Sequence, residues 1–275
     1  MPDLYYEQIS TLPAELHSRL GHIAAYGLSV DQLADPTSRE SAIFQDVFAS
    51  YRATKADFKR EDRGWLVDDS HLSRFFDGVK LRNGTPLEVM AQCIGRDPNN
   101  VGIDIAGGTN GVAMRDLVAT GLVGKGLYTH FLDDRNPRLS NPNVDLVTGD
   151  LATAQPWLSI RDWQQRNAPQ GFAVALHAPG LGFEKWAPDT HLTALAMLLP
   201  MMQPGAVIFT QVPIEVLKDG NQEARLDFYR AARRLPQVVA IELAESNKYG
   251  STGYNFCVVY VKASPKPDST PESKV

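Results

Sequence analysis

The fold of this chain is decided by the stretch Val101-Gly102-Ile103-Asp104-Ile105-Ala106-Gly107-Gly108-Thr109-Asn110-Gly111. A β-branched run ends in a glycine cluster, and a helical pattern follows at once. Glycines at such a junction let the backbone turn sharply and approach a ligand where a Cβ would block it. The free N–H groups at the start of the new helix then face whatever is bound. The stretch predicts a strand, a loop and a helix that form a site for a nucleotide or a nucleotide-like cofactor.

The composition is that of an ordinary globular protein. The 275 residues are 43% hydrophobic and 21% charged, enough for one large domain or for one domain with a cap. A net charge of −5 disfavours a broad nucleic-acid or anionic-membrane surface. Cys93 and Cys257 lie in apolar contexts without CxxC spacing, which predicts no metal or redox site. Without a signal-like leader or a run long enough to cross a membrane, we expect a cytoplasmic protein.

Few strand-like runs occur in residues 1–84, for which the sequence predicts a helical cap that supplies substrate contacts. Thr37 and Glu40 have the spacing of a capping box at the start of one helix. From residue 38 to about 60, apolar side chains recur at three- and four-residue steps along one helical face. These side chains are Phe44, Val47, Phe48, Tyr51 and Phe58.

Residues 85–262 are predicted to form a doubly wound α/β core. The core opens with a helix, because Thr85 and Glu88 have capping-box spacing and Pro86 suits the first helical position. From Val101 onward, short apolar runs alternate with helical patterns, which indicates crossover connections and a mostly parallel sheet. The predicted strands lie at 101–105, 127–132, 144–148, 172–176, 206–210, 238–243 and 256–261.

The last of these strands differs from the others. Only a short loop with Gly and Ser precedes it, which leaves no room for a helical crossover, so it should pair antiparallel with its predecessor. The predicted fold class is therefore α/β: a doubly wound, mostly parallel seven-stranded sheet with an antiparallel last strand, plus the N-terminal helical cap. Residues 263–275, rich in Pro, Ser and charged residues, are predicted to be a disordered tail.

The carboxyl ends of the predicted strands carry polar side chains. In a doubly wound sheet, ligands bind beyond these ends. The first strand offers Asp104 and the glycine cluster, and the second ends at Asp133-Asp134, whose carboxylates can accept hydrogen bonds from ribose hydroxyls. The third is followed by Asp150-Leu151, where a carboxylate can accept from an exocyclic amine. Together these groups describe an adenosine pocket.

This succession resembles the class I S-adenosylmethionine-dependent methyltransferases across residues 85–262. In that family the first strand and its loop commonly read Asp-x-Gly-x-Gly-x-Gly, and the matching positions here are Asp104, Ala106, Gly108 and Asn110. The segment 198–209 is similar to the family's helix, Pro-Gly turn and fifth strand. The resemblance implies S-adenosyl-L-methionine as the cofactor. It assigns cofactor binding to Asp104, Ala106, Gly107, Gly108, Asn110, Asp133, Asp134, Asp150 and Leu151.

Two loop positions depart from the family pattern, since Ala106 adds a methyl group and Asn110 is a residue that tolerates a left-handed backbone. A non-catalytic, methyltransferase-like binding or scaffold subunit therefore stays open as an alternative. An NAD(P)-dependent oxidoreductase is a second alternative, because Ala106-x-Gly108-x-x-Gly111 is one substitution from the dinucleotide fingerprint. Gly149-Asp150 and the closing antiparallel strand fit a methyltransferase better.

His177 is the candidate catalytic residue. It ends the fourth predicted strand, where the resemblance places the transferring methyl group, and an imidazole there could act as the base for an amine or hydroxyl acceptor. A helix-capping or structurally hydrogen-bonded histidine is the alternative. No histidine shows metal-ligand spacing, so no metal is expected. The expected acceptor is a small molecule or a peptide, and a homodimer stays open as the oligomeric state.

Overall fold

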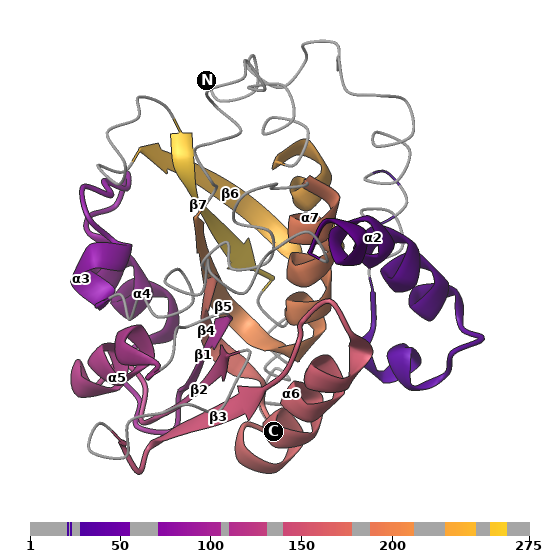
Figure 1. The fold of residues 1–275 in the computed structure, drawn as a ribbon. Coiled ribbons are helices and arrows are strands. Elements are labelled where there is room, and N and C mark those ends of the chain that lie inside the picture. The colour runs from indigo at the N-terminus through magenta and orange to yellow at the C-terminus, as the bar shows by residue number, and fades with distance from the viewer. Residues whose placement is uncertain are drawn as a thin grey trace, which may run out of the picture.

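A seven-stranded sheet forms the centre of the molecule in the computed structural model (Figure 1). The described residues are 21, 23, 28–55, 71–105, 110–130, 140–177, 188–211, 229–245 and 254–262. The sheet order is β3-β2-β1-β4-β5-β7-β6. Its strands are β1 (Val101–Ile105), β2 (Lys125–His130), β3 (Val144–Thr148), β4 (Phe172–His177), β5 (Met202–Gln211), β6 (Val238–Glu245) and β7 (Tyr254–Val261).

The pairing of the strands confirms the predicted fold class. The pairs β1–β2, β1–β4, β2–β3 and β4–β5 are parallel, whereas β7 runs antiparallel to both β5 and β6. The prediction gave the direction of β7 but not its place between β5 and β6. This insertion buries β7 and leaves β6 at one edge of the sheet, with β3 at the other.

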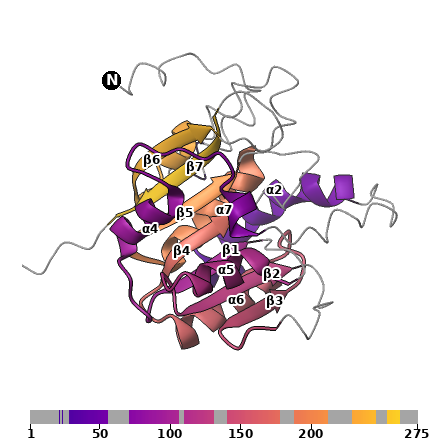
Figure 2. The same ribbon diagram turned by 90° about the vertical axis from the view of Figure 1, so that its left-hand side faces the viewer.

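Helices cover both faces of the sheet, as Figures 1 and 2 show from two directions. One face carries η2 (Val30–Ala34), α2 (Arg39–Lys55), α6 (Ala154–Asn167) and α7 (Pro188–Leu198), the last followed by η5 (Leu199–Met201). The other face carries α3 (Leu72–Phe75), α4 (Pro86–Ile94) and α5 (Val112–Ala119). The leading segments thus pack on both faces, and a division between cap and core at residue 84 stays a prediction.

Alternate residues of each strand point into opposite apolar layers. In β1, Ile103 and Ile105 belong to the layer under α6 and α7. In β4, Ala175 belongs to that same layer, whereas Val174 and Leu176 belong to the layer under α5. This alternation puts Asp104 on the α5 face of the sheet and His177 on the α7 face.

Two glycines let α5 approach the sheet closely. Gly111 precedes α5 with a left-handed φ of 56°, and a Cβ there would lie 2.5 Å from the ring of Tyr128. Gly126 lies inside β2, and a Cβ there would lie 2.4 Å from Cγ of Met114. Gly126 therefore serves helix packing rather than chain reversal. Because the strand continues through this glycine, β2 begins two residues before its predicted start.

The two predicted capping boxes have different outcomes. The box before α4 is confirmed, because the Thr85 hydroxyl accepts from Glu88 N–H and the Glu88 carboxylate accepts from Thr85 N–H. The box before α2 is wrong by one residue. Ser38 Oγ accepts from Ser41 N–H at 3.0 Å, whereas the Thr37 hydroxyl donates to Asp35 at 2.6 Å. The competing turn around Asp35 occupies the Thr37 side chain.

Candidate active site at the carboxyl edge of the sheet

Five of the predicted site residues lie within the described part of the chain: Asp104, Asn110, Asp150, Leu151 and His177. The other five lie outside the described residues, and their roles stay predictions: Ala106, Gly107, Gly108, Asp133 and Asp134. The register of β1 and β4 pairs Asp104 with Leu176 and Ile105 with His177. The structure therefore brings Asp104 and His177 to the same edge of neighbouring strands, on opposite faces of the sheet.

Asp104 is a buried carboxyl group near the end of β1. Only 2% of its surface is exposed, and burial raises its pKa to about 8. Its neighbours in register are Tyr128 and Leu176, and among the described residues no N–H or O–H group donates to its carboxyl group. A buried carboxyl group without a donor costs free energy, because it loses water and gains no replacement. A cation or a hydrogen-bond donor on a ligand would offset that cost.

His177 ends β4 and is 1% exposed. Its Nδ1 lies 3.2 Å from Oγ1 of Thr210, the residue paired with it across β4 and β5. Its Nε2 is buried and has no hydrogen-bond partner in the described part of the chain. Burial lowers the pKa of His177 to about 4, so its imidazole is neutral at physiological pH. A neutral imidazole can present a lone pair to a substrate.

His191 on α7 joins this group, a role that the sequence analysis missed. Its Nε2 lies 2.7 Å from Oγ1 of Thr210, and its ring centroid lies 4.3 Å from that of His177. The pKa of His191 lies well below its ordinary value, because of burial and then because of the neighbouring His177. Thr210 occupies on β5 the position that His177 occupies on β4, which is the sequence signal that could have identified Thr210.

The turn after β3 leads directly into α6. Gly149 has a positive φ of 136°, and Asp150 Oδ1 accepts from Ala152 N–H at 3.0 Å. The carbonyl oxygen of Leu151 accepts from the Trp157 indole at 2.9 Å, and the Leu151 side chain is buried in the layer under α6. These bonds fix the backbone at this strand end. Cofactor contacts by Asp150 and Leu151 stay predictions, as do those of Asn110, which directly precedes Gly111.

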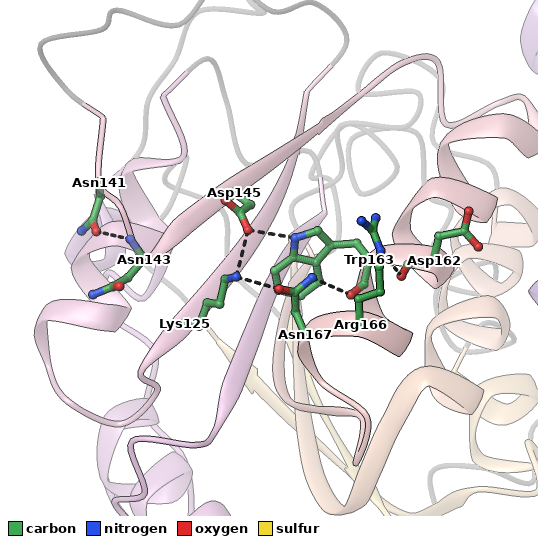
Figure 3. Close-up of polar contacts among 8 residues, drawn as sticks. All are labelled: Lys125, Asn141, Asn143, Asp145, Asp162, Trp163, Arg166 and Asn167. Atoms are coloured by element: carbon green, nitrogen blue, oxygen red, sulfur yellow. Dashed lines mark hydrogen bonds and ion pairs between the residues drawn. The ribbon is translucent and has the colours of Figure 1, made fainter.

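A second polar cluster lies at the opposite, amino-terminal edge of β2 and β3 (Figure 3). The carboxylate of Asp145 accepts from the Trp163 indole at 2.9 Å and lies 3.2 Å from Nζ of Lys125. The same ammonium group donates to Asn167 at 2.8 Å and lies 5.2 Å from the centre of the Trp163 ring. We define these four residues as the α6 anchor, because they bind α6 to two strands.

Within the described ranges, no group of three His, Cys, Asp or Glu side chains could hold a metal ion. No helix in the part of the chain that the structure describes is long and apolar enough to cross a membrane.

Comparison with known proteins gives matches among solved structures only. No family model matches the sequence, and no curated protein matches it. The similar structures include the MycE methyltransferase from the mycinamycin biosynthetic pathway in complex with Mg, SAH and mycinamycin VI (14% identity, TM-score 0.42, 72% of this chain and 50% of that chain). Spermidine synthase from Thermotoga maritima is 12% identical (TM-score 0.38, 68% of this chain and 63% of that chain). TrmN from Thermus thermophilus is 13% identical (TM-score 0.38, 64% and 47%).

The chain spans about half the length of the MycE chains that it matches. Its own sheet order decides the fold: four parallel pairs and an inserted antiparallel last strand. The fold is a doubly wound, Rossmann-like α/β fold.

Proposed function

We propose that the chain binds S-adenosyl-L-methionine and transfers its methyl group to a small molecule or a peptide. The observation that carries the proposal is Asp104, a buried carboxyl group near the end of β1 to which no described residue donates, in the strand that leads into the glycine cluster. The cofactor, when bound, supplies a sulfonium-activated methyl group and an amino-acid ammonium group. A cation is the ligand feature that would compensate a buried carboxylate.

The role of Asp104 has a consequence that can be measured. With a pKa of about 8, most of this carboxyl group is protonated at pH 7 in the unliganded protein. A bound ammonium group favours the carboxylate, so binding should release a proton. The anionic pyrophosphate that a dinucleotide places against such a loop would instead disfavour the carboxylate, so it would give no reason for proton release.

The adenosine end of the cofactor is assigned to the remaining strand ends. Asp133 or Asp134 would accept from the ribose hydroxyls, and Asp150 with Leu151 would contact the adenine. The glycine loop would lie against the amino-acid end of the cofactor, and its backbone N–H groups would donate to that end: Ala106, Gly107, Gly108 and Asn110.

His177 is the proposed base. Its unpaired Nε2 would accept the proton that a nitrogen or oxygen acceptor loses on methylation. Its buried position keeps water from competing for the lone pair. The structural alternative for His177 accounts for its Nδ1 contact with Thr210, but it leaves the second ring nitrogen unexplained.

The first experiment is a calorimetric titration of the purified chain with S-adenosylhomocysteine and, separately, with NADH. We expect micromolar binding of S-adenosylhomocysteine, about −8 kcal/mol, and no NADH signal. Repeating the titration in buffers of different ionisation enthalpy measures the proton release. Binding of NADH alone would instead support the oxidoreductase, and no binding of either ligand would support a scaffold subunit.

A further inference from the structure

We propose that Thr210 and His191 are positioning residues for His177: they hold its imidazole as the Nδ1–H tautomer and so keep the lone pair on the unpaired Nε2. This inference deepens the proposed function and rests on it for the identity of the group that Nε2 meets. The arrangement of the three side chains can be tested without any ligand.

The Thr210 hydroxyl group contacts both imidazoles with a single proton. Oγ1 of Thr210 lies within hydrogen-bond distance of both His177 Nδ1 and His191 Nε2. A hydroxyl group has one proton, so it can donate to only one of these two ring nitrogens. The other nitrogen must carry a proton and donate to Oγ1. The two imidazoles are therefore coupled through Thr210.

The two distances indicate the direction of the coupling. The contact with His191 is 2.7 Å, which suits donation by a hydroxyl group, and the contact with His177 is 3.2 Å, which suits donation by a ring N–H group. Thr210 then donates to His191, and His177 donates to Thr210 from Nδ1. A neutral imidazole has only one N–H group, so Nε2 of His177 carries the lone pair.

Burial explains why the arrangement holds. His177, His191 and Thr210 are all buried, the two imidazole rings lie 4.3 Å apart, and the register of β4 and β5 fixes Thr210 beside His177. Water cannot replace a lost partner at such a site, so each hydrogen bond is worth more than on the surface. Nε2 is the ring atom of His177 for which no described residue provides a hydrogen-bond partner.

The chemical consequence concerns one proton. During transfer, the acceptor's N–H or O–H bond would break and its proton would bind Nε2, while the acceptor keeps the electron pair. The imidazolium that forms keeps its Nδ1–H bond to Thr210. The proton then passes from Nε2 to water that enters while the product leaves, which restores the neutral ring before the site closes again. His191 touches no reacting atom and acts only by orienting the Thr210 hydroxyl.

The test is a long-range ¹H–¹⁵N spectrum of the six histidines in the ¹⁵N-labelled full chain, with His177→Gln used to assign the signals of His177. We expect a protonated Nδ1 and an unprotonated Nε2 for His177. Thr210→Ser should keep this pattern because it keeps the hydroxyl group. Thr210→Val should give averaged shifts of two tautomers, with folding checked by circular dichroism. A proton on Nε2 in the unmodified chain would overturn the inference.

Kinetics provide the second readout. Thr210→Val should lower kcat about tenfold with KM within twofold, and Thr210→Ser should restore kcat to within twofold of the unmodified chain. Equal losses of kcat in Thr210→Val and Thr210→Ser would overturn the positioning role. Such losses would come from altered packing and not from the missing hydroxyl group. Should the chain bind no S-adenosylhomocysteine while the spectrum shows the expected tautomer, the proposed function fails and the positioning of His177 stands.

Discussion

The two edges of the central sheet hold polar side chains in opposite ways. At the amino-terminal edge, the α6 anchor pairs every charged group, and its Lys125 and Asp145 side chains are 35% and 43% exposed. At the carboxyl edge, Asp104 and Nε2 of His177 are buried and no described group pairs with them. The sheet therefore pairs the charged groups of the α6 anchor, whereas these two groups at the carboxyl edge have no partner among the described residues.

The difference supports the proposal that a ligand binds at the carboxyl edge. A polar group that only stabilises a fold finds its partner within the protein, because an unpaired buried group costs about 1–3 kcal/mol. The Asp104 carboxyl group and Nε2 of His177 are two such groups on neighbouring strands. A bound molecule could offset the free energy that their burial costs. Changes at the carboxyl edge should therefore alter chemistry and binding, whereas changes in the α6 anchor should alter stability alone.

The largest effect is expected from His177→Gln. Loss of a positioned base should lower kcat by about 10²–10⁴-fold, while the affinity for S-adenosylhomocysteine stays within twofold. Single-turnover kinetics on an identified acceptor and calorimetry measure the two quantities. A loss of kcat below tenfold would remove His177 from the role of base and leave it as a structural residue.

The next largest effect is expected in the loss of stability at acid pH. Burial lowers the pKa of His177 from 6.5 to about 4, so between these values the unfolded chain binds a proton that the folded chain does not. Stability should therefore be full above pH 6.5 and fall as the pH drops toward 4, by roughly 3 kcal/mol from this group. His191 acts in the same direction.

Comparison of His177→Gln with the unmodified chain isolates the contribution of His177 to the pH dependence of stability. Urea unfolding at pH 7 and pH 4.5 should show a clearly smaller loss of stability in His177→Gln than in the unmodified chain. Asn167→Ala, in the α6 anchor, carries no titratable change and should lose the same free energy of unfolding at both pH values. An unchanged pH slope in His177→Gln would mean that water reaches the imidazole.

Asp104→Asn should give an intermediate effect on binding. The amide cannot compensate a cation, so the affinity for S-adenosylhomocysteine should fall about 30-fold, or about 2 kcal/mol. Proton release on binding should disappear from the calorimetric signal. Asp162→Asn, an exposed change on α6, is the matched control and should leave both quantities unaltered.

Although Asp104→Asn should weaken binding, it should make the folded chain more stable at high pH. Because the pKa of Asp104 is raised, the folded chain holds a proton that the unfolded chain loses, and this carboxyl group makes the protein less stable as the pH rises from about 4 to 8. Asp104→Asn should thus raise Tm at pH 8, by about 4 °C or more, and have little effect at pH 4. Weaker binding together with a lower Tm at pH 8 would indicate a packing defect instead.

The sequence predicted the central strands well because buried parallel strands are short, mostly apolar runs, as in β1 and β4. The prediction from sequence failed where tertiary packing determines the secondary structure. It missed α6, whose buried face combines Trp157, Ile160 and Trp163 with the polar Gln164 and so lacks a purely apolar stripe. The early start of β5 at Met202 also went unpredicted, since Pro and Gly inside the strand indicate a turn.

For the site, the sequence could place Asp104 and His177 at strand ends but could not say which face each one occupies. Burial and the resulting pKa shifts depend on helices that pack over the sheet. The contact between Thr210 and His191 arises only when α7 lies on β4 and β5, and nothing in the local pattern around either residue encodes it. The order of strands and helices along the chain can thus be predicted from strand patterns, whereas hydrogen bonds between side chains of different elements cannot.

The smallest effect should come from Asp145→Asn in the α6 anchor. The substitution removes the ion pair with Lys125 and weakens the acceptor for the Trp163 indole (Figure 3). Both charged side chains are partly exposed, so solvent screens the pair and the free energy of unfolding should fall by only about 1 kcal/mol. Urea unfolding measures this loss, and Asp162→Asn should change stability by less than about 0.5 kcal/mol. Binding of S-adenosylhomocysteine should stay within twofold, because the substitution removes one attachment of α6 to the amino-terminal edge and changes no residue at the carboxyl edge. A threefold or greater loss of affinity would show that the two edges are coupled through α6, and the division of the sheet into a structural edge and a functional edge would then be wrong.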